Sequence, residues 1–362
     1  MSEAPTRTST PRHARPESGD AGSPAGVAGA QQNPPPEAPI STLGTAGPRT
    51  NETKKVVRPG DRIFTTLTSG SAIFITVLIG AIAVFLVWRA VPALSRNQVN
   101  FLTSHEWATV DITHMAFGVA DLFQATVLVS LFALVLAMPV SLGIAIFLTR
   151  YAPKKVSGPL AYVIDLLAAV PSVVYGLWGL LVLAPAIRPV AEWLNRNLDW
   201  LFLFKSGSGS VAGGGTIFTA GIVLAVMILP VITGVTREVF AQTPTSHIEA
   251  ALALGATRWE VVRMAVIPFG KSGYVSGSML GLGRALGETM ALYLILQTTS
   301  QRFGWSLFDS GATIASKIAL GYAEFNNNIQ AGAYIAAGLV LFVLTFVVNA
   351  SARAAVSRGR KS

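Results

Sequence analysis

The chain has 362 residues, of which 51% are hydrophobic and only 12% are charged, and its mean hydropathy is +0.54. Soluble domains carry about 25% charged residues, so this composition indicates a membrane protein. The net charge of +9 does not call for a nucleic-acid partner, because membrane proteins concentrate Lys and Arg on their cytoplasmic side. The absence of cysteine excludes disulfides, thiolate metal sites and cysteine nucleophiles, and the four scattered histidines disfavour a metal site.

Residues 1–55 are expected to be a disordered cytoplasmic tail. The segment is rich in Pro, Ala, Ser, Thr and Gly, with three consecutive prolines at 34–36 and hardly any large apolar side chain. Such a composition buries too little surface to offset the entropy of ordering the chain. The segment is not a signal peptide, because it lacks an apolar core of the required length near its start.

Residues 56–355 are expected to form an all-α integral membrane domain. A helix needs about 20 apolar residues to cross roughly 30 Å of hydrocarbon. Six segments meet that requirement, at about 70–92, 120–149, 158–187, 215–237, 272–298 and 330–351. Several of them contain proline, among these Pro139, Pro171 and Pro230. Neighbouring helices or cavity water tolerate such kinks, so the prolines alone decide nothing.

The distribution of Lys and Arg predicts that both termini are cytoplasmic. With that orientation and the first fifty residues omitted, cytoplasmic segments hold 15 Lys and Arg and outside segments hold 7. Residues 356–362 then form a basic cytoplasmic tail. On the outside, residues 189–203 place Trp193 and Trp200 at roughly helical spacing and predict an interfacial helix. No internal repeat is visible, which disfavours a secondary transporter of the repeat type.

The loop between the fourth and fifth predicted spans, residues 242–271, predicts two short helices joined by a glycine turn. Ser246 and Glu249 have the spacing of one capping box, and Thr257 and Glu260 have the spacing of a second. Gly255 is suited to the left-handed conformation that ends the first helix. By physics alone, an ordinary amphipathic connector is the favoured interpretation of these features, and a docking element is the alternative.

The fifth predicted span carries small residues four apart, Gly273, Gly277 and Gly281, which allow another helix to approach to backbone contact. The preceding stretch 270–272 reads Gly-Lys-Ser, like the end of a phosphate-binding loop. However, Ala265 stands where the first glycine is required and Pro268 interrupts the loop, so this chain is not expected to bind a nucleotide.

Arg284 and Glu288 lie near the middle of the same span, four residues apart on one helical face. Each charge costs roughly 2.5–3.5 kcal/mol at the centre of a bilayer. An ion pair at about 4 Å would recover roughly 4 kcal/mol, so one interpretation is a purely structural pair. In the other interpretation, Arg284 binds an oxyanion through its planar guanidinium, and Glu288 neutralises Arg284 when no anion is bound.

A third intramembrane charge, Asp165, lies in the third predicted span. Two interpretations stay open for it. A carboxylate beside an anion pathway discriminates between protonation states of the anion, whereas a structural carboxylate pairs with a basic residue elsewhere.

The predicted loop also carries a family resemblance. Glu249, Ala250 and Ala251, followed after three residues by Gly255 and later by Ile267-Pro268, resemble the EAA motif of ATP-binding-cassette importer permeases. Ala265 and Ile267 are conservative departures from that pattern, and the spacing is intact. The resemblance implies the type I importer permease fold. It also implies that Glu249, Ala250, Ala251 and Gly255 couple the ATPase stroke to the membrane helices.

Two further stretches are similar to phosphate importer permeases: RALGETMA at 284–291 and LLAAVPSVVYGLWG at 166–179. GDRIF at 60–64 and IAIFLTRYAP at 144–153 resemble the PstC-type subunit more than its PstA-type partner. The resemblance covers about residues 60–355. In this family Arg284 and Glu288 match the charged pair associated with substrate passage, and Asp165 stands where Glu is expected.

The resemblance implies a non-enzymatic transport subunit of the bacterial cytoplasmic (inner) membrane. Its expected partners are a PstA-type second permease, two ATPase subunits, an extracytoplasmic phosphate-binding protein and the lipid bilayer, with no nucleic acid. No cofactor is expected in this chain, and ATP and Mg belong to the ATPase. The alternatives are a permease for molybdate or sulfate, a secondary anion transporter, or a structural scaffold that leaves Arg284 and Glu288 unexplained.

Overall fold

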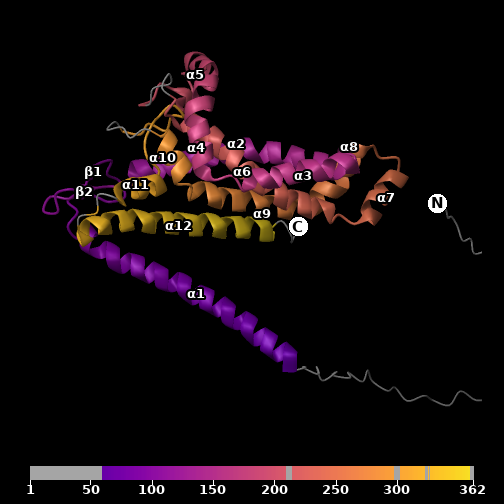
Figure 1. Ribbon diagram of the computed structural model, residues 1–362, viewed down its shortest axis with the longest axis horizontal. Coiled ribbons are helices and arrows are strands. Elements are labelled where there is room, and N and C mark those ends of the chain that lie inside the picture. Colours follow the sequence, from indigo (N-terminus) through magenta and orange to yellow (C-terminus); the bar gives the residue numbers. More distant parts are fainter. Residues whose placement is uncertain (1–58, 209–213, 297–301, 323–324, 326, 359–362) are drawn as a thin grey trace, which may run out of the picture. The chain divides into compact units, whose positions relative to one another are not determined.

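The computed structural model describes residues 59–208, 214–296, 302–322, 325 and 327–358 (Figure 1). The expected tail at 1–55 lies outside these residues. The chain divides into a unit that ends at Arg62 and a unit from Ile63 to Ser362, and every contact below lies within the second. Its described residues are overwhelmingly helical, with one short antiparallel pair of strands.

The elements follow one another along the chain with these bounds. The first half contains α1 (Pro59–Leu94), β1 (Trp107–Ala108), β2 (Ala116–Phe117), α2 (Ala120–Ile146), the π-helical turn η1 (Phe147–Tyr151), α3 (Lys154–Ala168), α4 (Ser172–Trp178), the π-helical turn η2 (Gly179–Leu183) and α5 (Ala184–Leu198). The second half contains the 3₁₀ turn η3 (Phe202–Phe204), α6 (Ile217–Ala241), α7 (Thr245–Ala253), α8 (Arg258–Val261), the π-helical turn η4 (Val262–Val266), α9 (Ile267–Leu286), α10 (Met290–Ile295), α11 (Ile314–Gly321) and α12 (Asn328–Arg358).

Five stretches of described helix are long and apolar enough to cross a membrane: Arg62–Leu94, Ala120–Tyr151, Ser172–Leu198, Ile217–Ala241 and Asn328–Ala354. Each overlaps one of the six predicted spans. The predicted fifth span, 272–298, is not among them, because the helix ends at Leu286 and a separate short helix begins at Met290. Its last two residues lie outside the described part of the chain.

The predicted third span, 158–187, is also not a continuous helix. It is divided between Ala168 and Ser172, where Pro171 lacks an N–H and restricts the residue before it. After the break, α4, η2 and α5 follow without interruption to Leu198. The helix expected at 189–203 is present as far as Leu198 and continues directly from α4 and η2, and its place at the membrane interface stays a prediction.

The most deeply buried helix is α6, which packs against α2, α3 and α9 (Figure 1). Its side chains form the main apolar core with those of α2, α9 and α10. Burying such side chains stabilises a membrane protein chiefly through close packing, because lipid tails are as apolar as leucine. The position of α9 against α6 consequently depends on how closely their backbones approach.

Glycines on α9 permit this approach. A Cβ on Gly273 would lie 2.5 Å from Val239 Cγ2, and one on Gly281 would lie 2.7 Å from Ile232 Cγ1. A Cβ on Gly277 would lie 3.1 Å from the Val235 Cβ. All three glycines thus face α6 of the same chain.

A smaller apolar cluster joins the end of α1 to the start of α12 through Ala90, Ala93, Ala333 and Ala336. The remaining length of α1 is exposed within this chain, including large apolar side chains such as Phe74 and Trp88. An exposed apolar helix of this kind is typical of contact with lipid or with another membrane subunit.

Gly281→Ala should lower the free energy of unfolding by about 1–3 kcal/mol, because the new methyl group overpacks the contact with Ile232. Gly283→Ala is the matched control on the same helix, since a Cβ there meets nothing within 4 Å. Denaturant unfolding of the purified protein in detergent measures both variants. Equal effects of the two substitutions would contradict the packing described here.

Candidate functional site

Two short helices, α7 and α8, lie between α6 and α9 in the chain. The motif residues Glu249, Ala250 and Ala251 lie on α7, and Gly255 lies in the turn between the two helices. The glycine turn between them is confirmed, because Gly255 has a φ of +81°. The first predicted capping box is wrong. The helix starts at Thr245, directly after Pro244, and Ser246 lies inside the helix, where its side chain does not cap.

The second capping box is confirmed at the start of α8. The backbone N–H of Thr257 donates to Oε2 of Glu260 at 2.7 Å, and the N–H of Glu260 donates to Thr257 Oγ1 at 3.4 Å. The hydrogen bond from the Thr257 backbone, followed by the one from its hydroxyl, lowers the pKa of the Glu260 carboxyl. This box fixes the direction in which α8 leaves the turn.

The loop has an anchored base and an exposed tip. Behind the capping box, Val262 and Val266 are buried against Phe240 of α6 and against Ala145 and Ile146 of α2. The tip leaves apolar side chains uncovered, namely Leu252, Leu254, Trp259 and Met264, and Leu254 is 90% exposed. Glu249 and Ala250 are exposed beside them, and Ala251 is half-buried. An apolar surface on a rigid base is typical of a docking site for another protein.

Arg284 and Glu288 do not form the expected ion pair: among the described residues, no carboxylate lies within ion-pair distance of Arg284. The reason is that α9 ends at Leu286, so the two residues are no longer one turn apart on a continuous helix. The buried Glu288 instead accepts a hydrogen bond from the Ala291 N–H at 3.2 Å and so caps the start of α10. Gly287 and Thr289, both poor helix formers, flank it.

Arg284 is exposed in this chain and lines an open groove of roughly 520 Å³. The groove lies among α6, α9 and α12, and its other lining residues are Val231, Met279, Leu280, Gly283, Thr345 and Asn349. An exposed guanidinium without an acidic neighbour is chemically suited to bind an anion.

Asp165 lies outside the groove of Arg284. Its Oδ2 lies 3.2 Å from Nη2 of Arg237, and this ion pair joins α3 to α6. Asp165 is not among the residues that line the groove of Arg284. The structure therefore places the carboxylate beside a basic partner and apart from the other two intramembrane charges.

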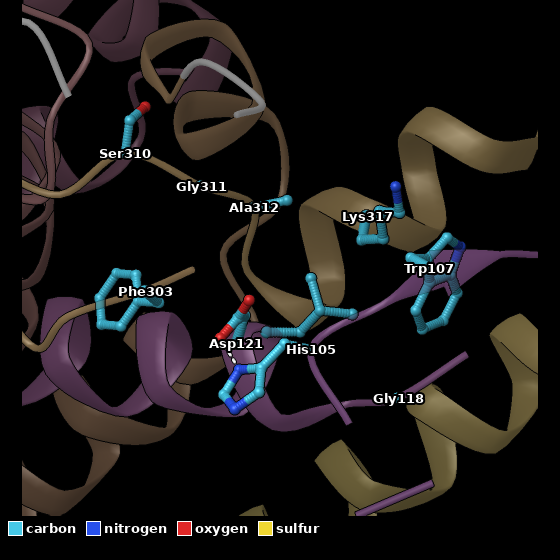
Figure 2. Close-up of a pocket in the computed structure, with 10 residues that line it drawn as sticks. His105, Trp107, Gly118, Asp121, Phe303, Ser310, Gly311, Ala312 and Lys317 are labelled. Carbon is cyan, nitrogen blue, oxygen red and sulfur yellow. Dashed lines mark hydrogen bonds and ion pairs between the residues drawn. The ribbon is translucent and has the colours of Figure 1, made fainter. Parts of the chain in front are cut away.

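A small pocket of about 90 Å³ that the sequence did not predict lies where the β1–β2 region meets α2 and α11 (Figure 2). There Nδ1 of His105 lies 2.5 Å from Oδ1 of Asp121, and Lys317 lies over the ring of Trp107 at 5.5 Å from its centroid. Its lining comes from separate segments of the chain, so no local spacing pattern could have indicated it.

Residues 137–361 match the family model described as binding-protein-dependent transport system inner membrane component. The phosphate transport system permease protein PstC 2 of Mycobacterium tuberculosis is 60% identical over 297 residues, covering 82% of this chain and 92% of that protein. The PstC protein of Mycobacterium leprae is 57% identical over 305 residues, covering 84% and 95%. An inward-facing structure of the MetNI methionine ABC transporter matches with a TM-score of 0.46 and 14% identity, covering 67% of this chain and 95% of that one.

The capping box should protect the start of α8 at neutral pH and lose this effect in acid. Because the pKa of Glu260 is lowered on folding, its contribution is present above the ordinary carboxyl pKa and disappears as the pH falls through the lowered value. Hydrogen–deuterium exchange of residues 257–262, corrected for intrinsic rates, should differ between the wild type and Thr257→Val at neutral pH. A difference that persisted unchanged at the most acidic pH tested would count against this assignment.

Arg284→Ala and Glu288→Ala should have additive effects on stability, because the two side chains do not pair. Glu288→Ala alone should cost about 1 kcal/mol through the lost cap. A double-mutant cycle on unfolding in detergent should give a coupling energy below about 0.5 kcal/mol. A coupling clearly above that value would instead support an ion pair in solution.

Proposed function

Since the chain belongs to the binding-protein-dependent transport system inner membrane components, and within them to the PstC-type phosphate permeases, we propose that it is a membrane-embedded subunit of an ATP-driven phosphate importer. The observation that carries this proposal is the similarity to curated phosphate permeases, at 57–60% identity over more than four fifths of this chain. The matched stretch contains both the α7–α8 loop and the groove of Arg284.

In this proposal the α7–α8 loop is the coupling element. The exposed Leu254 and Trp259 dock on a cytoplasmic ATPase, and Glu249, Ala250, Ala251 and Gly255 form the surface that it grips. Support comes from the buried base of the loop, where Val262 and Val266 attach it to α6 and α2. A displacement of the tip is therefore transmitted to the membrane helices and not absorbed within the loop.

The partners follow from the same assignment. A PstA-type permease covers the exposed apolar helices, two ATPase subunits bind and hydrolyse ATP with Mg, and an extracytoplasmic binding protein delivers phosphate. The complex lies in the bacterial inner membrane with both ends of this chain in the cytoplasm, as the excess of Lys and Arg in the corresponding loops supports. This subunit itself catalyses no reaction.

Arg284 is the proposed contact for the oxyanion. Its guanidinium keeps its charge at every physiological pH and offers a planar fork that matches phosphate oxygens. Glu288 supports it indirectly, by capping α10 and so holding the chain break next to Arg284. Asp165, paired with Arg237, stabilises the contact between α3 and α6 near the proposed cytoplasmic side.

The deciding experiment is phosphate uptake by vesicles that contain the complete complex with its binding protein. Uptake should require ATP hydrolysis, and excess sulfate or molybdate should not compete. Uptake that continued unchanged without ATP hydrolysis would exclude an importer of this class. Competition by sulfate or molybdate instead of phosphate would assign the permease to another oxyanion.

Arg284→Ala should reduce uptake about thirtyfold or more, because removing one partner of a charge-assisted contact costs about 2 kcal/mol or more. Assembly and association with the ATPase should be preserved, since Arg284 forms no ion pair among the described residues. Co-purification of the partners checks that point, and Arg284→Lys should recover part of the activity. Loss of assembly in Arg284→Ala would show a structural role.

A further inference from the structure

Helix α12 carries a row of polar residues along one face of its C-terminal half. Thr345, Asn349 and Arg353 follow one another at intervals of four residues and therefore lie on one face. An amide such as that of Asn349 is costly in hydrocarbon unless it finds a hydrogen-bond partner or water. The side-chain amide of Asn349 has no hydrogen-bond partner in the described part of the chain. The hydrogen bond from Nε of Arg353, at 3.4 Å, goes to the backbone carbonyl of Asn349 and not to its side chain.

Two residues of this row lie beside Arg284. Thr345 and Asn349 line the same groove as Arg284 and Gly283, opposite each other across the contact of α12 with α9. The space beside Arg284 is open, because a Cβ on Gly283 would meet nothing within 4 Å. The lining contains no carboxylate, so Arg284 supplies the only charge among the described residues that form it.

The side chains that line the groove offer both hydrogen-bond donors and hydrogen-bond acceptors. Arg284 offers donors only, whereas the amide of Asn349 offers two donors and one acceptor. The hydroxyl of Thr345 donates to the Phe342 carbonyl at 2.9 Å and so keeps its oxygen as an acceptor. A hydrogen phosphate ion presents both oxygens and an O–H, whereas sulfate at neutral pH presents oxygens only.

We propose that Asn349, with Thr345, forms the second half of an oxyanion site whose first half is Arg284, and that it selects a protonated oxyanion over sulfate. The inference rests on the proposed function, because it specifies the same site. The guanidinium of Arg284 pairs with the charge of the ion, and the side-chain N–H of Asn349 donates to one of its oxygens. The O–H of the ion donates a hydrogen bond to the side-chain oxygen of Asn349 or of Thr345. Helix α12 is then part of the pathway and not only a packing helix.

The absence of cysteine from the chain allows a direct test. In the assembled complex, Asn349→Cys should react with a small anionic thiosulfonate reagent, read as a mass shift of this chain. Phosphate should slow this reaction at least about fivefold, and sulfate at the same concentration should not. Ser351→Cys is the matched control on another face of α12, and phosphate should leave its reactivity unchanged.

An Asn349→Cys variant that does not react, as expected if lipid or the second permease covers this position, would overturn the inference. The inference would also be overturned if phosphate did not change the reaction rate of Asn349→Cys, or if sulfate slowed the reaction as much as phosphate does. These results leave the proposed function untouched as long as the wild-type complex takes up phosphate with ATP. Failure of the wild-type complex to do so would count against the proposed function itself.

Transport provides a second measurement. Asn349→Leu should raise the half-saturating concentration of phosphate about tenfold, the usual effect of losing a hydrogen bond to a charged group. Asn349→Leu should also reduce the selectivity of uptake for phosphate over sulfate. Asn349→Gln should keep a half-saturating concentration and a selectivity close to those of the wild type. An unchanged half-saturating concentration and preference in Asn349→Leu would contradict a substrate contact, and a fall in maximal rate alone would indicate a structural role.

Discussion

The close approach of α9 to α6 is the constraint on which the other features depend. Gly273 and Gly281 leave no room for a side chain against Val239 and Ile232, so the backbone of α9 lies directly against these side chains of α6. In a bilayer, where apolar side chains gain little from leaving the lipid, such contact is the main source of helix–helix stability. It fixes the height and rotation of α9, and therefore decides that Arg284 faces the groove beside α12 and not the core.

The same contact connects the membrane helices to the loop. The loop leaves the end of α6 and returns at the start of α9, and its base is buried against Phe240 and Ala145. Because both ends of the loop belong to one tightly packed pair of helices, the exposed tip at Leu254 is an extension of that pair. In the proposed function, α9 is therefore the element that would connect docking at the tip to the position of Arg284.

Sequence reasoning succeeded where a short pattern has one physical meaning. The Thr257–Glu260 box and the left-handed Gly255 follow from local hydrogen bonding, and both are confirmed. It failed where an apolar run hides a local break, as at Pro171 and at Gly287, because hydropathy averages over these positions. That Asn349 and Arg284 line one groove could not be predicted either, since this proximity exists only after α12 folds back along α9.

The interruption between Leu286 and Met290 separates two anchored pieces of helix. On one side, α9 is held by α6; on the other, α10 is held by α4, where a Cβ on Gly176 would lie 2.9 Å from the Ala291 Cα. The three residues between these pieces, Gly287, Glu288 and Thr289, are the only part of this stretch outside a helix. In the proposed function this interruption would act as a hinge between the two helices, and Arg284 lies directly before it, near the end of α9.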